Sequence, residues 1–257
     1  MTELGTYVYA IGRYLSGDQL AEVRGQSDIP VRTIAHRDLV AVVSTVDLSE
    51  FGESALRQNL EDIRWVETTA RRHHEVVRRT SEVTTALAPF RLVTIYRSDD
   101  AARVRMEELY DELAVVLDRV EGRGEWGVKV HHRTSDRSGP KATTSAGGAG
   151  TGVAYLEQRR AALRDKEAAL AHQQLLSDEL FWDLVPGAAA TRRLVPQDQR
   201  LSGRSEPMTL NAAFLVDHDR SSAFLRLVDD ARIKYPSLVI EVDGPWPPYS
   251  FAVLDQA

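Results

Sequence analysis

Two neighbouring histidines followed by a carboxylate form the stretch with the clearest chemical potential. His73, His74 and Glu75 precede Arg78, and the run from His74 to Arg78 differs in one position from the His-Glu-x-x-His motif of zinc proteases. That motif needs both imidazoles on one helix face, where they reach one zinc ion. Arg78 occupies the second histidine position, and its guanidinium would repel the metal. The sequence therefore indicates no zinc site, and we interpret His73 as a buried core histidine in preference to a catalytic one.

Two glycine-rich segments match nucleotide-binding loops in letters but not in context. Gly122 to Gly127 fits the pattern Gly-x-Gly-x-x-Gly, yet it follows an expected helix and opens an expected strand. A dinucleotide site needs the opposite order, so that amides at a helix N-terminus point at the pyrophosphate. Gly147 to Gly152 precedes an expected helix, but no strand leads into it and no Gly-Lys-Ser/Thr follows. We expect no cofactor at either segment.

The remaining chemical signatures are also incomplete. His131 and His132 would lie on opposite faces of a strand, where they cannot easily chelate one metal ion. The chain has no Gly-x-Ser-x-Gly nucleophile elbow and no cysteine, which removes thiolate chemistry, disulfides and cysteine-ligated metals. From these signatures we expect no catalytic residue, cofactor or metal. An enzyme that uses His73 or His74 in a pocket is kept as an alternative.

The composition is that of an ordinary globular protein. Hydrophobic residues make up 43% and charged residues 27% of the 257 positions, which disfavours disordered and fibrous classes. The net charge of −6 disfavours nucleic acid as the main partner, because phosphate binding needs clustered Lys and Arg. The amino terminus lacks the basic start and apolar core of a secretory signal, and no run reaches the ~18 apolar residues of a membrane-spanning helix. We therefore expect a cytoplasmic protein without a nucleic-acid or membrane partner.

The first half of the chain alternates between strand-like and helix-like patterns. Ile63, Val66, Ala70, His73 and Val77 follow spacings of three and four, which places them on one stripe of a helix. Strand and helix in this order imply an α+β or α/β unit whose helices cover a sheet. Strands are expected at residues 6–11, 31–34, 39–46, 90–96 and 126–131, and helices at 17–24, 63–84 and 98–120.

A change of composition divides the chain. Residues 133–151 are rich in Gly, Ser and Thr, which predicts a linker between an N-terminal α+β domain (1–132) and a C-terminal domain (152–257). The C-terminal domain should open with a long helix, because residues 153–184 lack proline and are rich in good helix formers. Strands are expected next at 192–195 and 211–216, then a helix at 217–235 and a strand from 238.

The end of the chain should form a rigid corner between two strands. Pro245, Pro247 and Pro248 surround Trp246, and a second apolar run follows from Tyr249. Prolines lack an N–H donor and push the preceding residue toward extended conformations, so they suit a corner and not a central strand. We expect Trp246 to pack under its own loop.

Several runs together resemble one family, the gas vesicle F/L accessory proteins. The matching stretches follow one another through nearly the whole chain, apart from the linker. They are residues 48–53 (LSEFGE), 59–65 (NLEDIRW), 72–75 (RHHE), 90–96 (FRLVTIY), 121–130 (EGRGEWGVKV), 152–160 (GVAYLEQRR), 211–217 (NAAFLVD) and 244–251 (GPWPPYSF).

The resemblance implies a protein of gas vesicle formation that is not an enzyme. It implies an N-terminal α/β sandwich-like domain and a C-terminal domain with a modified ferredoxin-like fold beside a long helix. Family members are assembly factors or minor vesicle components, thought to bind the small hydrophobic shell protein and limit its aggregation during nucleation. The implied location is cytoplasmic and gas vesicle-associated, and other gas vesicle accessory proteins are further expected partners.

The binding surface is predicted in the N-terminal domain. The early strands leave an edge or a sheet face on which an apolar segment could dock, and Val31, Ile34, Leu39 and Val42 are the predicted contact residues. A small-molecule-binding, ferredoxin-like regulatory module is the other alternative, and it would need a cleft between βαββ units.

Overall fold

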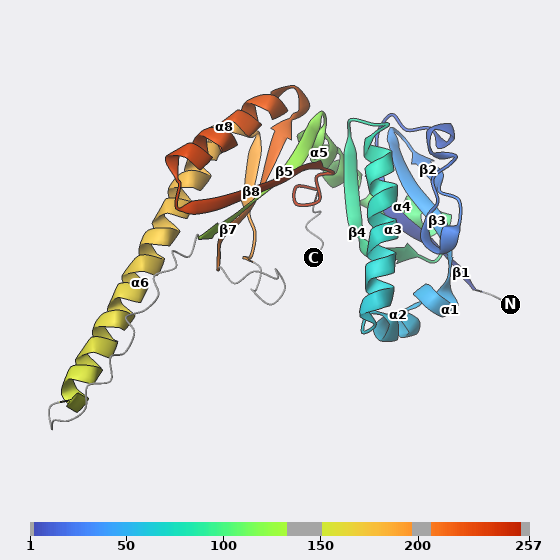
Figure 1. Ribbon diagram of the computed structural model, residues 1–257. Helices are drawn as coiled ribbons and strands as arrows, with labels where there is room; N and C mark the ends of the chain where they lie inside the picture. Colours follow the sequence, from blue (N-terminus) through green and yellow to red (C-terminus); the bar gives the residue numbers. More distant parts are fainter. Residues whose placement is uncertain (1–2, 133–150, 197–206, 253–257) are drawn as a thin grey trace. The chain divides into compact units, whose positions relative to one another are not determined.

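The computed structural model describes residues 3–132, 151–196 and 207–252. Its fold is α+β, as predicted, with two four-stranded antiparallel sheets (Figure 1). The chain divides into two compact units that interleave in sequence. The first comprises Met1–Trp126, Leu215–Asp219 and Gly244–Ala257, and the second comprises Gly127–Phe214 and Arg220–Asp243.

The first sheet is antiparallel and has β1 near its centre. β1 pairs with β3 on one side and with β4 on the other, so Tyr7 lies between Ser44 and Ile95. The order β2-β3-β1-β4 leaves β2 and β4 as the edge strands. The strands are β1 (Leu4–Gly12), β2 (Arg32–His36), β3 (Leu39–Asp47) and β4 (Leu87–Tyr96).

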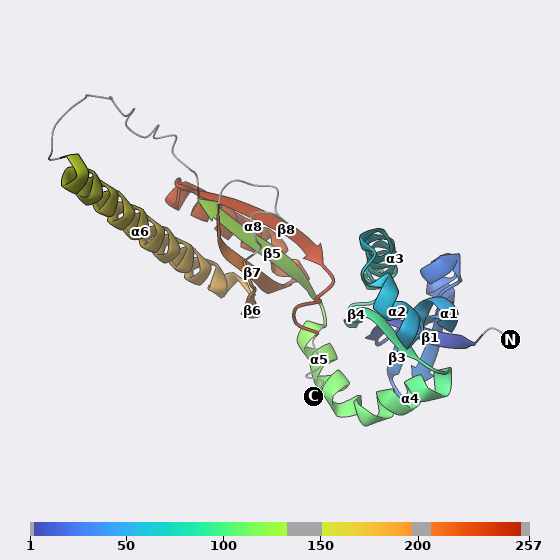
Figure 2. The ribbon, with the colours of Figure 1, turned by 90° about the horizontal axis from the view of Figure 1, so that it is seen from below.

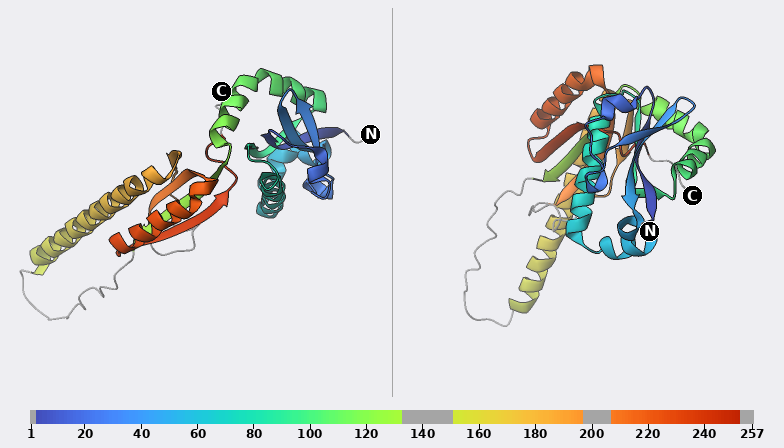
Figure 3. Two further views of the ribbon diagram at one scale, coloured as in Figure 1. Left: turned by 90° about the horizontal axis from the view of Figure 1, so that it is seen from above. Right: turned by 90° about the vertical axis from the view of Figure 1, so that its right-hand side faces the viewer.

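Both faces of this sheet are covered by helices. Figures 2 and 3 show α3 (Ile63–Ser81) on one side, and α4 (Asp99–Glu108) and α5 (Tyr110–Val120) on the other. Side chains of β1 divide between two cores: Val8 and Ile11 face α4 and α5, and Tyr7 and Tyr9 face α3. A strand buried on both faces must be apolar throughout, which explains the near-continuous apolar run of β1.

Capping residues set where the covering helices begin. The Asp62 carboxylate accepts a hydrogen bond from the Arg64 amide at the start of α3, and the Ser98 hydroxyl accepts one from the Ala101 amide at the start of α4. The carboxylate of the next residue, Asp99, accepts hydrogen bonds from both terminal guanidinium nitrogens of Arg32, at 2.7 and 2.8 Å. This ion pair ties the start of α4 to strand β2.

Three predicted elements differ in detail. The helix expected at 98–120 is two helices that meet at Leu109, whose backbone lies outside the α-helical region. Only a short 3-10 turn, Gly17–Leu20, forms where a helix was expected at 17–24. Pro89 was expected to precede the strand but lies within β4, where its missing N–H is tolerated because β4 is an edge strand.

The second sheet has the topology of a ferredoxin-like fold. Strands and helices follow one another as β5-α6-β6-β7-α8-β8, and the strands are arranged in the order β6-β7-β5-β8. The elements are β5 (Arg123–His132), α6 (Thr151–Leu184), β6 (Ala190–Arg193), β7 (Met208–Asp217), α8 (Ser221–Lys234) and β8 (Leu238–Trp246).

The first strand of this sheet, β5, lies inside the segment 1–132 that was predicted as the N-terminal domain. The change of composition after His132 follows the first strand of a βαβ unit, so it marks a connection within the second sheet. Independent folding of residues 1–132 and 152–257 stays a prediction.

The chain returns to the first unit at its end. After β8, residues 247–252 form turns, so the second strand expected from Tyr249 is absent from this part of the structure. Ala252 is buried in the core that faces α4 and α5, and Tyr249 packs against the core that faces α3. Both the amide and the hydroxyl of Ser250 donate to the Glu125 carboxylate, at 2.7 and 2.6 Å. Trp246, expected to pack under its loop, is 43% exposed.

This packing predicts that the C-terminal segment stabilises the first unit. Phe251 is buried, and Phe251→Ala should lower the free energy of unfolding of the first unit by about 3 kcal/mol, because it leaves a cavity. Urea dependence of hydrogen exchange in peptides from β1 and α3 measures this change. Val115→Ala, at an exposed position of α5, should change it by less than about 0.5 kcal/mol. Equal effects of both substitutions would contradict the prediction.

Candidate functional site

The first residue of the histidine pair lies in the core of the first unit. His73 is 3% exposed, and its Nδ1 lies 3.0 Å from the Tyr7 hydroxyl. That hydroxyl accepts a hydrogen bond from the Val93 amide, so its own proton is available to His73 Nδ1. Burial lowers the pKa of His73 from 6.5 to about 4, which keeps the ring neutral at pH 7. His73 is therefore a hydrogen-bonded core histidine, as the sequence predicted.

The two residues after His73 point to different neighbours. The His74 ring lies 5.6 Å from the Trp246 ring and stacks on Tyr249 at 6.0 Å. The Glu75 carboxylate accepts hydrogen bonds from Arg78 and Arg79, and the Arg78 guanidinium lowers the pKa of that carboxyl. The three side chains do not converge on one site. Within residues 3–132, 151–196 and 207–252, no group of three or more His, Asp or Glu side chains is placed to hold a metal ion.

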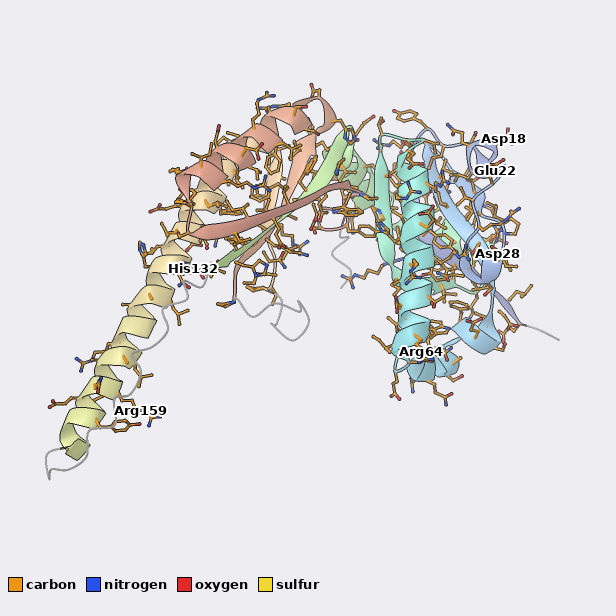
Figure 4. All side chains as sticks on the ribbon, viewed as in Figure 1. Asp18, Glu22, Asp28, Arg64, His132 and Arg159 are labelled. Carbon is orange, nitrogen blue, oxygen red and sulfur yellow. The ribbon has the colours of Figure 1, made fainter. Side chains whose placement is uncertain are left out.

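The glycine-rich motif at 122–127 and the histidine pair at 131–132 have structural roles. Gly122, with φ at +69°, makes the turn from α5 into β5, and a side chain at Gly124 would approach Pro245 to 2.8 Å. No helix begins at this motif. His131 is buried and His132 is half-buried at the end of β5 (Figure 4). Gly147–Gly150 lie outside the described residues.

The four predicted contact residues lie in the interior of the first unit. Ile34 and Leu39 belong to the core that faces α4 and α5, whereas Val31 and Val42 belong to the core that faces α3. Helices cover both sheet faces, and all four side chains are buried. Among the described residues of the first unit, helices lie over both faces of the sheet, and β2 is an edge strand.

A groove of about 670 Å³ lies between the first two short helices and the far end of edge strand β4. The helices are α1 (Leu48–Phe51) and α2 (Glu53–Asn59). Buried Phe51 and partly buried Val93 and Ile95 contribute apolar surface to the groove, beside charged residues such as Glu53 and Arg57. The lining residues are Glu3, Leu48, Phe51, Gly52, Glu53, Ser54, Leu56, Arg57, Val93, Ile95, Tyr96 and Arg97.

The buried Tyr7 network helps to shape this groove. Val93 has a positive φ of 58°, which is uncommon for a β-branched residue. The Tyr7 hydroxyl accepts the Val93 amide at 3.0 Å and supports this conformation. The bulge in the pairing of β1 with β4 falls at the same place, between Val8 and Ala10 of β1. The buried Tyr7 hydroxyl thus helps to fix the backbone path of β4, the strand that borders the groove.

Two exposed apolar side chains follow α2 in the chain. Leu60 follows Leu56 by one helical turn and is 49% exposed, and Ile63 at the start of α3 is 76% exposed. The helical stripe had predicted a buried Ile63, but that position precedes the part of α3 that packs on the sheet. The spacing of Leu56, Leu60 and Ile63 is the sequence signal that could have indicated this surface. We call Leu56, Leu60, Ile63 and the groove the α2 apolar site.

The comparisons with known proteins agree on one family. Residues 5–253 match the profile of a family described as "Gas vesicle synthesis protein GvpL/GvpF". The chain is 38% identical over 247 residues to gas vesicle protein L of Streptomyces sp. (strain CB03234), covering 96% of this chain and 92% of that protein. The chain belongs to the GvpL/GvpF family. Gas vesicle protein F of the same strain is 27% identical, over 96% of this chain and 99% of that protein.

Solved structures of the family have the same fold. The crystal structure of GvpF from Anabaena sp. PCC7120 matches with a TM-score of 0.67 at 18% identity, covering 98% of each chain. That of GvpF from Microcystis aeruginosa matches with a TM-score of 0.69 at 19% identity, covering 97% of this chain and 99% of that chain. The resemblance seen in the sequence motifs is confirmed, and the GvpL/GvpF chain described here has the two-part α+β fold of these structures.

Burial of His73 predicts a specific pH dependence of stability. Its folded pKa lies below its ordinary value of 6.5, so only the unfolded chain takes up the proton as pH falls toward 4. The stabilisation is complete above pH 6.5 and is lost between 6.5 and about 4, with a total of roughly 3 kcal/mol. Urea unfolding of the wild type and of His73→Gln at several pH values measures the difference. The variant should lose this part of the slope, and the control His74→Gln, at the partly buried neighbouring histidine, should retain it. An unchanged slope in His73→Gln would show that His73 is not responsible.

Proposed function

We propose that this GvpL/GvpF-family protein binds the small hydrophobic gas vesicle shell protein and limits its aggregation during vesicle nucleation. Family membership supports a role in gas vesicle assembly. The observation that carries the finer proposal is the α2 apolar site, which combines the apolar residues Phe51, Leu56 and Val93 of the groove with the exposed Leu60 and Ile63 that follow α2 in the chain. Exposed large apolar side chains beside a groove support an interaction site.

The geometry of the site suits an apolar segment of a partner. The groove ends at the edge strand β4, so an extended segment could lie along β4 while its side chains enter the groove. An amphipathic helix could place its apolar face against Leu56 and Leu60 in the same groove. A shell subunit that exposes an apolar face is an aggregation hazard until it is incorporated, and covering that face is the activity we propose.

Charges at the rim leave the apolar contact as the main source of affinity. Glu53 and Arg57 form an ion pair with each other at 2.6 Å, one turn apart on α2. An exposed pair of this type contributes little, and salt weakens it further. Binding of the shell protein should therefore persist at raised salt, because burial of apolar surface is not screened.

The function that we propose is binding of a partner, and it requires neither catalysis nor a cofactor. Burial of His73 and the packing of the His74 ring against Trp246 and Tyr249 argue against the enzyme alternative. The description of the family names gas vesicle synthesis and names no chemical reaction. None of the helices in the described ranges combines the length and the apolar character needed to cross a membrane. We keep the cytoplasmic, vesicle-associated location as part of this proposal.

The test is shell-protein solubility during co-expression with the full-length chain. The wild type should raise the soluble fraction, and the double variant Leu60→Glu/Ile63→Glu should lose most of this protection. Losing two buried aliphatic contacts of about 1.5–3 kcal/mol each would weaken binding more than tenfold. Val115→Glu is the matched control, because Val115 is an exposed apolar residue on α5, away from the site.

The outcomes separate the site from the function. Protection that survives in the double variant would contradict the α2 apolar site but leave the chaperone-like role intact. A full-length chain that never raises shell-protein solubility would contradict the functional proposal itself. Full-length chains are needed for this test, since residues 249–252 pack in the first unit and a fragment that ends at residue 132 lacks them.

A further inference from the structure

The outer face of α6 carries a stripe of exposed residues. In Figures 1 and 2, the first half of this helix extends past the sheet of its own unit. Leu175 is 61% exposed and Trp182 is 66% exposed, both large exposures for apolar side chains on an ordered helix. All members of the stripe are exposed, and they are Ala161, Arg164, Ala168, Ala171, His172, Leu175, Glu179 and Trp182.

Helix geometry places these residues on one face. At 3.6 residues per turn they fall within a sector of about 100°, wide enough for one helix-packing surface. Ser177, Leu180 and Leu184 are buried and occupy the opposite side of α6, which packs on the rest of the second unit. The stripe therefore faces away from the rest of its own unit. The Trp182 ring contacts the buried Phe181 ring in a T-shaped arrangement, with the ring centroids 5.4 Å apart, but Trp182 stays 66% exposed, and Leu175 is 61% exposed.

The stripe is complementary to itself when two copies run antiparallel. If the twofold axis passes between Ala171 and His172, every position i faces position 343 − i of the other helix. Large residues then meet small ones, because Trp182 faces the partner's Ala161 and Leu175 faces the partner's Ala168. A parallel pair would instead stack Trp182 on Trp182 and leave Ala161 opposite Ala161.

The charges follow the same register. Arg164 faces the partner's Glu179, and the twofold axis repeats this contact, giving two ion pairs. Neither Arg164 nor Glu179 forms an ion pair with any of the described residues. Within one chain they are 15 positions apart, or ~22 Å along the helix, too far to pair with each other. A parallel arrangement would place like charges opposite one another.

We propose that the outer face of α6 is a dimerisation surface, on which a second copy of this chain docks antiparallel through Trp182, Leu175 and the Arg164–Glu179 pairs. The overlap of residues 161–182 is about 33 Å long. This surface belongs to the second unit and does not involve the α2 apolar site. Its occupant is a second copy and not a shell subunit, so it can be tested without any gas vesicle component.

A second exposed stripe on α6 does not share this complementarity. Tyr155, Leu163 and Leu170 are exposed on the side of the helix that continues the packed face, not on the outer face. They lie outside the antiparallel contact and provide a control position. Arg159 is likewise exposed on the projecting part of the helix (Figure 4).

Charge reversal tests the register. Sedimentation equilibrium of the full-length wild type should show a monomer–dimer equilibrium. Arg164→Glu and Glu179→Arg should each weaken dimerisation about tenfold, because two attractive contacts become repulsive. The double variant Arg164→Glu/Glu179→Arg should restore the wild-type dissociation constant. Trp182→Ala should also weaken dimerisation at least tenfold, and Leu163→Gln should leave it unchanged. Circular dichroism and thermal unfolding verify that each variant is folded.

Cross-linking tests the direction of the helices. The chain has no cysteine, so a single introduced thiol reports on its own position. Ala171→Cys lies beside the proposed twofold axis and should form a disulfide-linked dimer, whereas Ala161→Cys should remain uncross-linked. Cross-linking at Ala161 but not at Ala171 would overturn the antiparallel arrangement. A wild type that stays monomeric at high micromolar concentration, or single charge reversals that do not change dimerisation, would overturn the proposal.

Discussion

Burial of β1 on both faces is the constraint on which the first unit depends. This strand pairs with β3 and β4, so its backbone groups are satisfied within the sheet, and its side chains from Gly5 to Gly12 are all buried. A strand in this position needs a helical layer on each face. α3 supplies one layer, and α4 with α5 supplies the other. The sheet thus has no free face, and apolar contact with a partner is left to edges and to exposed helix positions.

The polar groups inside this core connect it to the proposed binding surface. Tyr7 and Tyr9 are buried with their hydroxyls satisfied by His73, Ser44 and the amides of Val93 and Gln26. Burial raises the pKa of both tyrosines, and it lowers that of His73, so the whole group is uncharged at neutral pH. Because Tyr7 holds the Val93 amide, the same network sets the path of β4 beside the α2 apolar site. The histidine that first suggested catalysis has a structural role instead.

The two units share the chain in an interleaved way. β5 opens the ferredoxin-like sheet before residue 133, and residues 247–252 return to the cores of the first unit after β8. Prolines suit this exit, since β8 is an edge strand and Pro245 deprives no inner strand of a hydrogen-bond donor. α6, by contrast, packs only one face of its second half on its own unit. That difference explains why apolar residues remain exposed on the long helix.

Sequence alone determined the types of most elements, the family and the mismatch to known catalytic motifs. The strands near residues 6–11 and 39–46 and the long helix from about 153 to 184 were recognisable because hydrophobic period and helix propensity are local properties. Ordered motifs along the chain identified the family, and Arg78 alone argued against the zinc motif. Each of these conclusions required only residues that are close to one another in the sequence.

Only the tertiary structure decided which apolar residues are covered. Periodicity shows that Val31, Ile34, Leu39 and Val42 are apolar strand positions, but two helical layers make them core and not contact surface. It equally placed Ile63 on a buried stripe, although Ile63 is 76% exposed and Trp65 is the residue of the same turn that packs on Phe51. The packing of Tyr249 and Ala252 depends on cores formed by residues that lie more than a hundred positions earlier in the chain. Burial depends on how the sheet and helix layers assemble. A local sequence pattern shows that a residue is apolar, but it does not show which element of the fold, if any, will cover that residue.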